Sequence, residues 1–119
     1  MSHLKAREVL SQVDALLPNP YTAAEKLRWL EQAEGFVKRE ILQNTDEIPS
    51  LTAESVLSVP APYDEMYRHY IEAQIHYANA EMSRYNNAST AWNNAFLTYR
   101  DYYCRTVTPR AAARTLRFC

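Results

Sequence analysis

The sequence predicts an all-α protein: a small bundle of about four helices in which two long helices form the C-terminal half. Only one glycine, Gly35, occurs in 119 residues, whereas β-hairpins depend on glycine at their tight turns. Apolar residues recur at helical spacing in segments separated by prolines. With 47% hydrophobic and 23% charged residues, the composition is that of a globular domain. We expect one helical domain over residues 1–108 and a basic tail over residues 109–119.

The first predicted helix covers residues 9–17 and is short. Its apolar residues follow the pattern of an amphipathic helix and are Val9, Leu10, Val13, Leu16 and Leu17. Pro18 and Pro20 come directly after it and end the helix, because proline cannot continue the backbone hydrogen bonds.

The second predicted helix covers residues 22 to about 43. Thr22 followed by Glu25 forms a capping box, in which both side chains satisfy backbone N–H groups at the helix start. Gly35 lies inside this helix and costs about 1 kcal/mol relative to alanine. We expect a close helix crossing at Gly35 to compensate for that cost.

An irregular connector is predicted over residues 44–61, because the helical periodicity breaks there among prolines, serines and acidic residues. The connector still contains apolar residues that predict contact with the domain: Ile48, Leu51, Val56, Leu57 and Val59.

The third predicted helix opens at Pro62 and Asp64 and continues to about Asn86. One apolar stripe along it contains Tyr67, Ile71, Ile75, Ala78, Met82 and Tyr85, and a second contains Met66, Tyr70, Ala73, Tyr77 and Ala80. After a break at Asn86 and Asn87, a fourth helix with Trp92, Ala95, Phe96 and Tyr99 ends near Thr106. Two apolar faces on the third helix indicate that it meets more than one partner surface.

Aromatic residues are concentrated in the second half of the chain, where eight of the nine tyrosines lie between Tyr63 and Tyr103. An apolar ring with a polar tip suits a surface that is buried on one side and hydrated on the other. We predict a subunit or partner interface at Tyr67, Tyr70, Tyr77, Tyr85, Trp92, Phe96 and Tyr99. The alternative is that these rings fill the core of a monomer.

One polar stripe of the third helix contains residues that can bind metal: Glu65, His69, Glu72 and His76. A carboxylate and an imidazole four residues apart can chelate a metal on a helix. A bundle metal site also needs a second carboxylate-rich helix, which the sequence does not offer. We therefore interpret the stripe as a hydrated face and predict no metal and no cofactor.

No catalytic motif is present: the sequence contains no phosphate-binding glycine loop, nucleophile elbow or zinc-protease motif. Cys104 and Cys119 have no paired spacing, and we interpret both as reduced thiols. The sequence therefore predicts a protein that is not an enzyme.

The formal net charge of −1 is unevenly distributed, because residues 105–119 contain four arginines and no acid. We predict that Arg110, Arg114 and Arg117 dock the tail on a partner, with a protein surface favoured over nucleic acid. The chain has no uninterrupted apolar run of membrane-spanning length and no secretion signal at its N-terminus, which predicts a soluble protein without a membrane partner.

Two segments of the sequence, which together cover most of residues 9–100, resemble the head-tail connector family of tailed phages and prophages, also called adaptor or head-completion proteins. The first segment contains Val13–Thr22, Lys26–Leu30 and Glu34–Ile41, and the second contains Val59–Tyr67, Tyr77–Glu81 and Arg84–Asn87. Residues 44–59 and 110–119 match no pattern of the family.

This resemblance implies a structural virion protein that self-associates into a dodecameric ring beneath the portal. Its partners are then the portal protein and the next connector or tail protein, and DNA passes through the channel only as cargo. Its place is the head-tail interface of the virion, after assembly in the host cytoplasm. The alternative function is a small cytoplasmic helical adaptor or regulator that binds a single protein or DNA partner.

Overall fold

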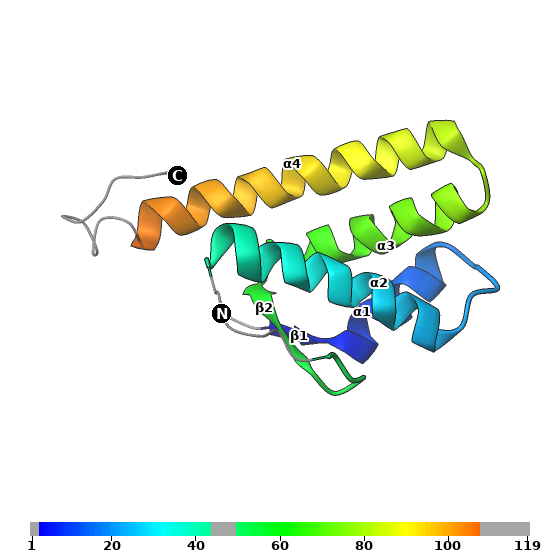
Figure 1. Ribbon diagram of the computed structural model, residues 1–119, viewed down its shortest axis with the longest axis horizontal. Helices are drawn as coiled ribbons and strands as arrows, with labels where there is room; N and C mark the ends of the chain where they lie inside the picture. The colour runs from blue at the N-terminus through cyan, green and yellow to red at the C-terminus, as the bar shows by residue number, and fades with distance from the viewer. Residues whose placement is uncertain (1–2, 44–49, 108–119) are drawn as a thin grey trace.

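The computed structural model describes residues 3–43 and 50–107 of the chain. These residues form a largely helical body that measures 49 × 31 × 25 Å (Figure 1). In chain order its elements are β1 (His3–Lys5), α1 (Ala6–Leu16), α2 (Ala23–Phe36), the π-helical turn η1 (Val37–Ile41), β2 (Val56–Pro60), α3 (Glu65–Ala78) and α4 (Met82–Val107). The prediction of a small all-α bundle is confirmed, with the addition of one short sheet.

Helix α3 is the centre of the fold, because it contacts α1, α2 and α4. The core beside it holds Val9, Val13, Leu30, Val37, Leu57, Val59, Met66, Tyr67, Ile71 and Ile75. Helix α4 lies antiparallel along α3 and makes most of its contacts there (Figure 1). One side of α4 therefore has no neighbour within the described part of the chain. In α1 the predicted apolar stripe is buried at its start, but Leu16 is 63% exposed.

Strands β1 and β2 pair antiparallel, with His3 opposite Pro60 and Lys5 opposite Val56 and an irregularity between them. Strand β2 lies within the predicted irregular connector over residues 44–61, and the glycine-poor sequence predicts few hairpins. The pairing needs no tight turn, because the whole of α1 and α2 lies between the two strands. The adjoining segment also caps α1: the first helical N–H groups, of Ala6 and Arg7, donate to carbonyls of Ser55 and Ala53 at 2.9 Å each.

Helix α2 begins at the predicted capping box. The N–H of Glu25 donates to Thr22 Oγ1 at 3.2 Å, and the N–H of Thr22 donates to Glu25 Oε1 at 3.0 Å. The close crossing expected at Gly35 is wrong, because a Cβ built on Gly35 would meet nothing within 4 Å. Gly35 borders an open hollow instead, and the helix then widens into the π-helical turn η1.

The break between α3 and α4 lies at residues 79–81 and not at Asn86 and Asn87, so the predicted boundary is wrong. Ala80 adopts a left-handed conformation with φ of 60°. Its N–H donates to the carbonyl of Tyr77 at 3.0 Å, and the N–H of Glu81 donates to that of His76 at 2.9 Å. This is the Schellman arrangement, in which glycine is the usual left-handed residue. Alanine at that position gives no sequence signal for a helix end.

The side chain of Lys26 is buried at 4% exposure and pairs with the half-exposed carboxylate of Asp14. Its Nζ donates to Asp14 Oδ1 at 2.5 Å, and this hydrogen bond holds the pKa of Asp14 below its usual value, with help from Asn19. The pair joins α1 to α2, and a carboxyl whose folded pKa is depressed stabilises the fold only at pH values where it is ionised.

Asp14→Asn is therefore expected to lower the free energy of unfolding by about 1 kcal/mol at neutral pH, a modest value because solvent screens the exposed carboxylate. The loss should shrink as pH falls below about 4, the usual pKa of an aspartate, and it should vanish below the lower pKa at which folded wild-type Asp14 is itself protonated. Urea denaturation at a series of pH values measures the difference. A difference that does not change between neutral and acidic pH would contradict this assignment.

Candidate functional site

Six side chains form an aromatic stripe beside the seam between α3 and α4: Phe36, Tyr70, Tyr77, Tyr85, Trp92 and Phe96. Tyr70 and Trp92 meet edge to face with ring centroids 5.0 Å apart, and Trp92 lies 5.2 Å from Phe96. Phe36 joins them from the end of α2, at 6.2 Å from Tyr70 and 6.4 Å from Trp92. Tyr77 and Tyr85 extend the stripe toward the α3–α4 turn, with centroids 5.3 Å apart.

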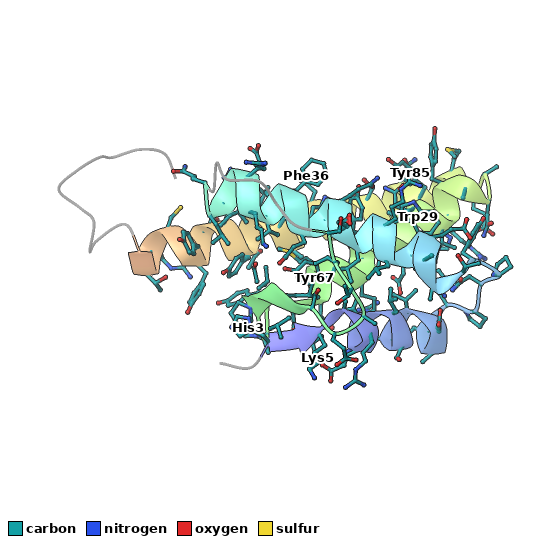
Figure 2. All side chains as sticks on the ribbon, turned by 60° about the horizontal axis from the view of Figure 1, so that its bottom comes forward. His3, Lys5, Trp29, Phe36, Tyr67 and Tyr85 are labelled. Carbon is teal, nitrogen blue, oxygen red and sulfur yellow. The ribbon has the colours of Figure 1, made fainter. Side chains whose placement is uncertain are left out.

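The aromatic stripe is partly exposed to solvent, and this exposure distinguishes its side chains from those of the buried core. Tyr77 is 59% exposed and Phe36 is 47% exposed, although both are large apolar side chains. Figure 2 shows Phe36 and Tyr85 along the edge of the molecule opposite His3 and Lys5 of β1. An exposed row of neighbouring rings on a small domain is typical of an interaction surface.

Two hollows in the surface adjoin each other at Phe36 and Glu40. One of about 400 Å³ is lined by Gln32, Gly35, Phe36, Arg39, Glu40 and Tyr70. The other, of about 170 Å³, is lined by Phe36, Glu40, Trp92, Asn93 and Phe96. Both therefore combine aromatic walls with amide or charged groups, as the contact surfaces of protein complexes do.

Tyr70 fixes the stripe to α2. Its hydroxyl donates to Gln32 Oε1 at 2.9 Å, which holds the ring at the wall of the larger hollow. Burial raises the pKa of Tyr70, and the nearby Tyr85 raises it further. The hydroxyl therefore stays protonated at neutral pH and acts as a hydrogen-bond donor.

Five of the seven predicted interface residues lie in this stripe, and two do not. Tyr67 is fully buried and Tyr99 is 4% exposed, so the prediction of an interface role is wrong for both. Tyr99 packs in a separate cluster with Tyr63, Tyr102 and Tyr103. Helical periodicity marked two apolar stripes on α3, but it could not tell which stripe faces α1 and α2.

Tyr67 belongs instead to a buried polar network around Glu34, whose side chain is 1% exposed. The Tyr67 hydroxyl donates to Glu34 Oε1 at 2.5 Å and accepts the N–H of Val59 at 3.1 Å. Ser58 donates to Glu34 Oε2 through its N–H at 3.0 Å and through its hydroxyl at 2.7 Å. The network joins α2, α3 and β2 in the interior, and both burial and Glu34 raise the pKa of Tyr67.

The polar stripe of α3 is arranged as ion pairs. Arg68 binds Glu72 at 3.1 Å and Glu65 at 3.5 Å, and His76 Nδ1 lies 2.8 Å from Glu81. Burial, followed by the charge of Arg68, lowers the pKa of His69. Within residues 3–43 and 50–107, no three histidine, cysteine or acidic side chains are grouped to hold a metal.

Several predicted features lie at or beyond the limits of the described chain. Arg110, Arg114 and Arg117, predicted to dock the tail, lie outside the described residues, as does Cys119. Cys104 is disulfide-bonded, so the interpretation of this residue as a reduced thiol is wrong.

Phe36 was not among the predicted interface residues, because it lies in the second predicted helix and outside the tyrosine-rich half of the chain. A signal for the seam was present in α4, where Tyr85, Trp92 and Tyr99 stand seven residues apart, as do Ala88 and Ala95. This heptad spacing is typical of a helix packed along a partner helix, and it runs through the position where the break was predicted.

Comparison with known proteins gives no matching family model, curated protein or solved structure. None of the helices in the described ranges is long and apolar enough to cross a membrane.

Proposed function

We propose that this chain is a structural subunit of the head-tail connector kind, which forms a ring beneath a portal and joins the DNA-filled head to the tail. The observation that supports the proposal most directly is the aromatic stripe. It presents rings from α2, α3 and α4 to solvent, beside two hollows. The role is performed through contact and involves no turnover.

A ring subunit needs two different contact surfaces, because ring contacts are head-to-tail. The stripe offers one of them. A second apolar position, Leu16 at the end of α1, is 63% exposed and belongs to another part of the fold. The distribution of exposed apolar side chains is therefore compatible with ring closure.

The test is electron microscopy of the purified full chain, alone and mixed with a portal protein taken from its own gene neighbourhood if one is encoded there. We expect rings with a central channel, or an added layer on the portal. Tyr77→Asp should abolish both, because a carboxylate would be buried in the contact, while the helical circular dichroism signal is retained since Tyr77 is exposed. Val56→Asp is the matched control, because it adds an acid at an apolar position of β2 that is 60% exposed and lies outside both proposed contact surfaces.

The outcomes separate the two candidate functions. If Tyr77→Asp assembles as wild type does, the stripe is not the contact. A folded wild-type chain that forms no ring and leaves the portal bare would reject the connector role and favour the small adaptor. Removing residues 110–119 tests the tail: unchanged assembly would exclude Arg110, Arg114 and Arg117 from the contact.

A further inference from the structure

Between residues 85 and 99, the outward side of α4 differs in chemistry from the other exposed helix faces in the described ranges. Exposed charged side chains occur on α4 only outside this window, at Arg84, Asp101 and Arg105. Residues 85–99 contain no charged side chain, although 23% of the chain is charged. Its exposed positions in this window carry amides and hydroxyls: Asn86, Asn87, Thr90, Asn93, Asn94 and Thr98. We call this set the amide face. By contrast, α1 exposes Arg7, Glu8 and Asp14, α2 exposes Glu25 and Arg28, and η1 exposes Arg39 and Glu40.

The residue types of the amide face are unfavourable for a helix surface that is exposed only to water. Asparagine and threonine are weaker helix formers than glutamate, lysine or alanine, and charged side chains are the usual source of solubility. The side chains of the four asparagines form no hydrogen bond with another described residue. Each amide therefore keeps both its donor and its acceptor available to a partner.

The chemistry of the face limits what can cover it. Nucleic acid needs cations to neutralise its phosphates, and the window has none. A charged protein surface would lose hydration without gaining an opposite charge. The partner must be uncharged and must both donate and accept hydrogen bonds, and the amide face itself has these properties.

The asparagines are also placed symmetrically. Asn86 and Asn94 stand four residues before and after Thr90, and Asn87 and Asn93 stand three residues before and after it. If two α4 helices run antiparallel and cross at Thr90, Asn86 of one copy meets Asn94 of the other, and Asn87 meets Asn93. A two-fold contact of this kind uses the same patch on both subunits.

We propose that the amide face of α4 binds the amide face of a second copy of this chain, with the two helices antiparallel and crossing at Thr90. Threonine at the crossing point is small enough to let the helix backbones approach. The amides on either side of it pair across the contact. This inference does not depend on the connector role, because the amide face lies on the outward side of α4 and the aromatic stripe lies along the seam with α3. Asn93 alone borders both, since it also lines the smaller hollow beside the stripe.

The test is analytical ultracentrifugation of the full chain over a range of concentrations, for wild type and for a Tyr77→Asp background that removes the proposed ring contact. The Tyr77→Asp background should form dimers, and wild type should form dimers or larger assemblies that contain them. Thr90→Lys and Thr90→Glu, each alone, should weaken dimerisation by at least about tenfold, because like charges then face each other at the crossing. An equimolar mixture of the two variants should regain it, since opposite charges then meet.

Ser11→Lys, on the exposed side of α1, is the matched control and should leave dimerisation unchanged. Lysine and glutamate are better helix formers than threonine, so circular dichroism should show α4 intact in both Thr90 variants. A wild-type chain that stays monomeric at high concentration would overturn the proposal. The proposal would also be overturned if the Thr90 variants dimerised as wild type does. If the equimolar mixture of the two variants did not regain dimerisation, a surface other than a second amide face would lie opposite the amide face.

Discussion

Tyr67→Phe is expected to lower the free energy of unfolding by about 2–3 kcal/mol, although it removes only one oxygen atom. The hydroxyl of Tyr67 donates to Glu34 and accepts from the N–H of Val59. Without it, a buried carboxylate oxygen loses a donor and a buried backbone N–H loses its acceptor. Water cannot replace either lost hydrogen bond, because Glu34 is 1% exposed and Val59 is fully buried.

Urea denaturation of the two proteins at neutral pH measures this effect. Tyr70→Phe is the matched control, since it removes a tyrosine hydroxyl from the same helix, but one that bonds an exposed Gln32 side chain. We expect that control to cost about 0.5 kcal/mol or less, because water can replace the lost partner. Equal losses for the two variants would show that the Glu34 network contributes no more than a surface hydrogen bond.

Leu30→Ala is expected to cost about 3 kcal/mol, from lost apolar burial and from the cavity that remains. Leu30 is fully buried where α2 meets the core. Thermal or urea unfolding monitored by circular dichroism gives the change.

Phe36→Ala, also in α2, provides the comparison. This side chain is larger, but it is 47% exposed, and we expect a loss of about 1 kcal/mol. A smaller loss of stability for Phe36→Ala than for Leu30→Ala would indicate that Phe36 contributes more to contact with a partner than to stability. A loss for Phe36→Ala as large as that for Leu30→Ala would place Phe36 in the core and remove it from the stripe.

Local signals in the sequence were sufficient to predict the ends of helices that are set by nearby residues. The capping box at Thr22 and Glu25 and the prolines after α1 act within a few positions, and the structure confirms both. The α3–α4 turn could not be found in this way, because Ala80 takes a left-handed conformation that alanine rarely adopts.

The sheet and the division of the tyrosines depend on tertiary contacts. Pairing of β1 with β2 depends on where α1 and α2 bring the two strands. Tyr67 and Tyr70 are three residues apart and equally aromatic, yet one reaches Glu34 in the interior and the other reaches Gln32 at the surface. Periodicity places both on apolar stripes, and only packing decides which stripe becomes the interaction surface.

The pairing of β1 with β2 also has a consequence for the order of folding. His3 bonds the carbonyl of Leu57 across 54 positions of sequence, so β1 has no partner until about half of these 119 residues have been synthesised. The α3–α4 hairpin joins neighbouring segments and closes only a short loop. Because entropy favours short-range closure, the hairpin is expected to form early and the sheet late. During synthesis on the ribosome, β1 therefore stays unpaired until β2 has been made.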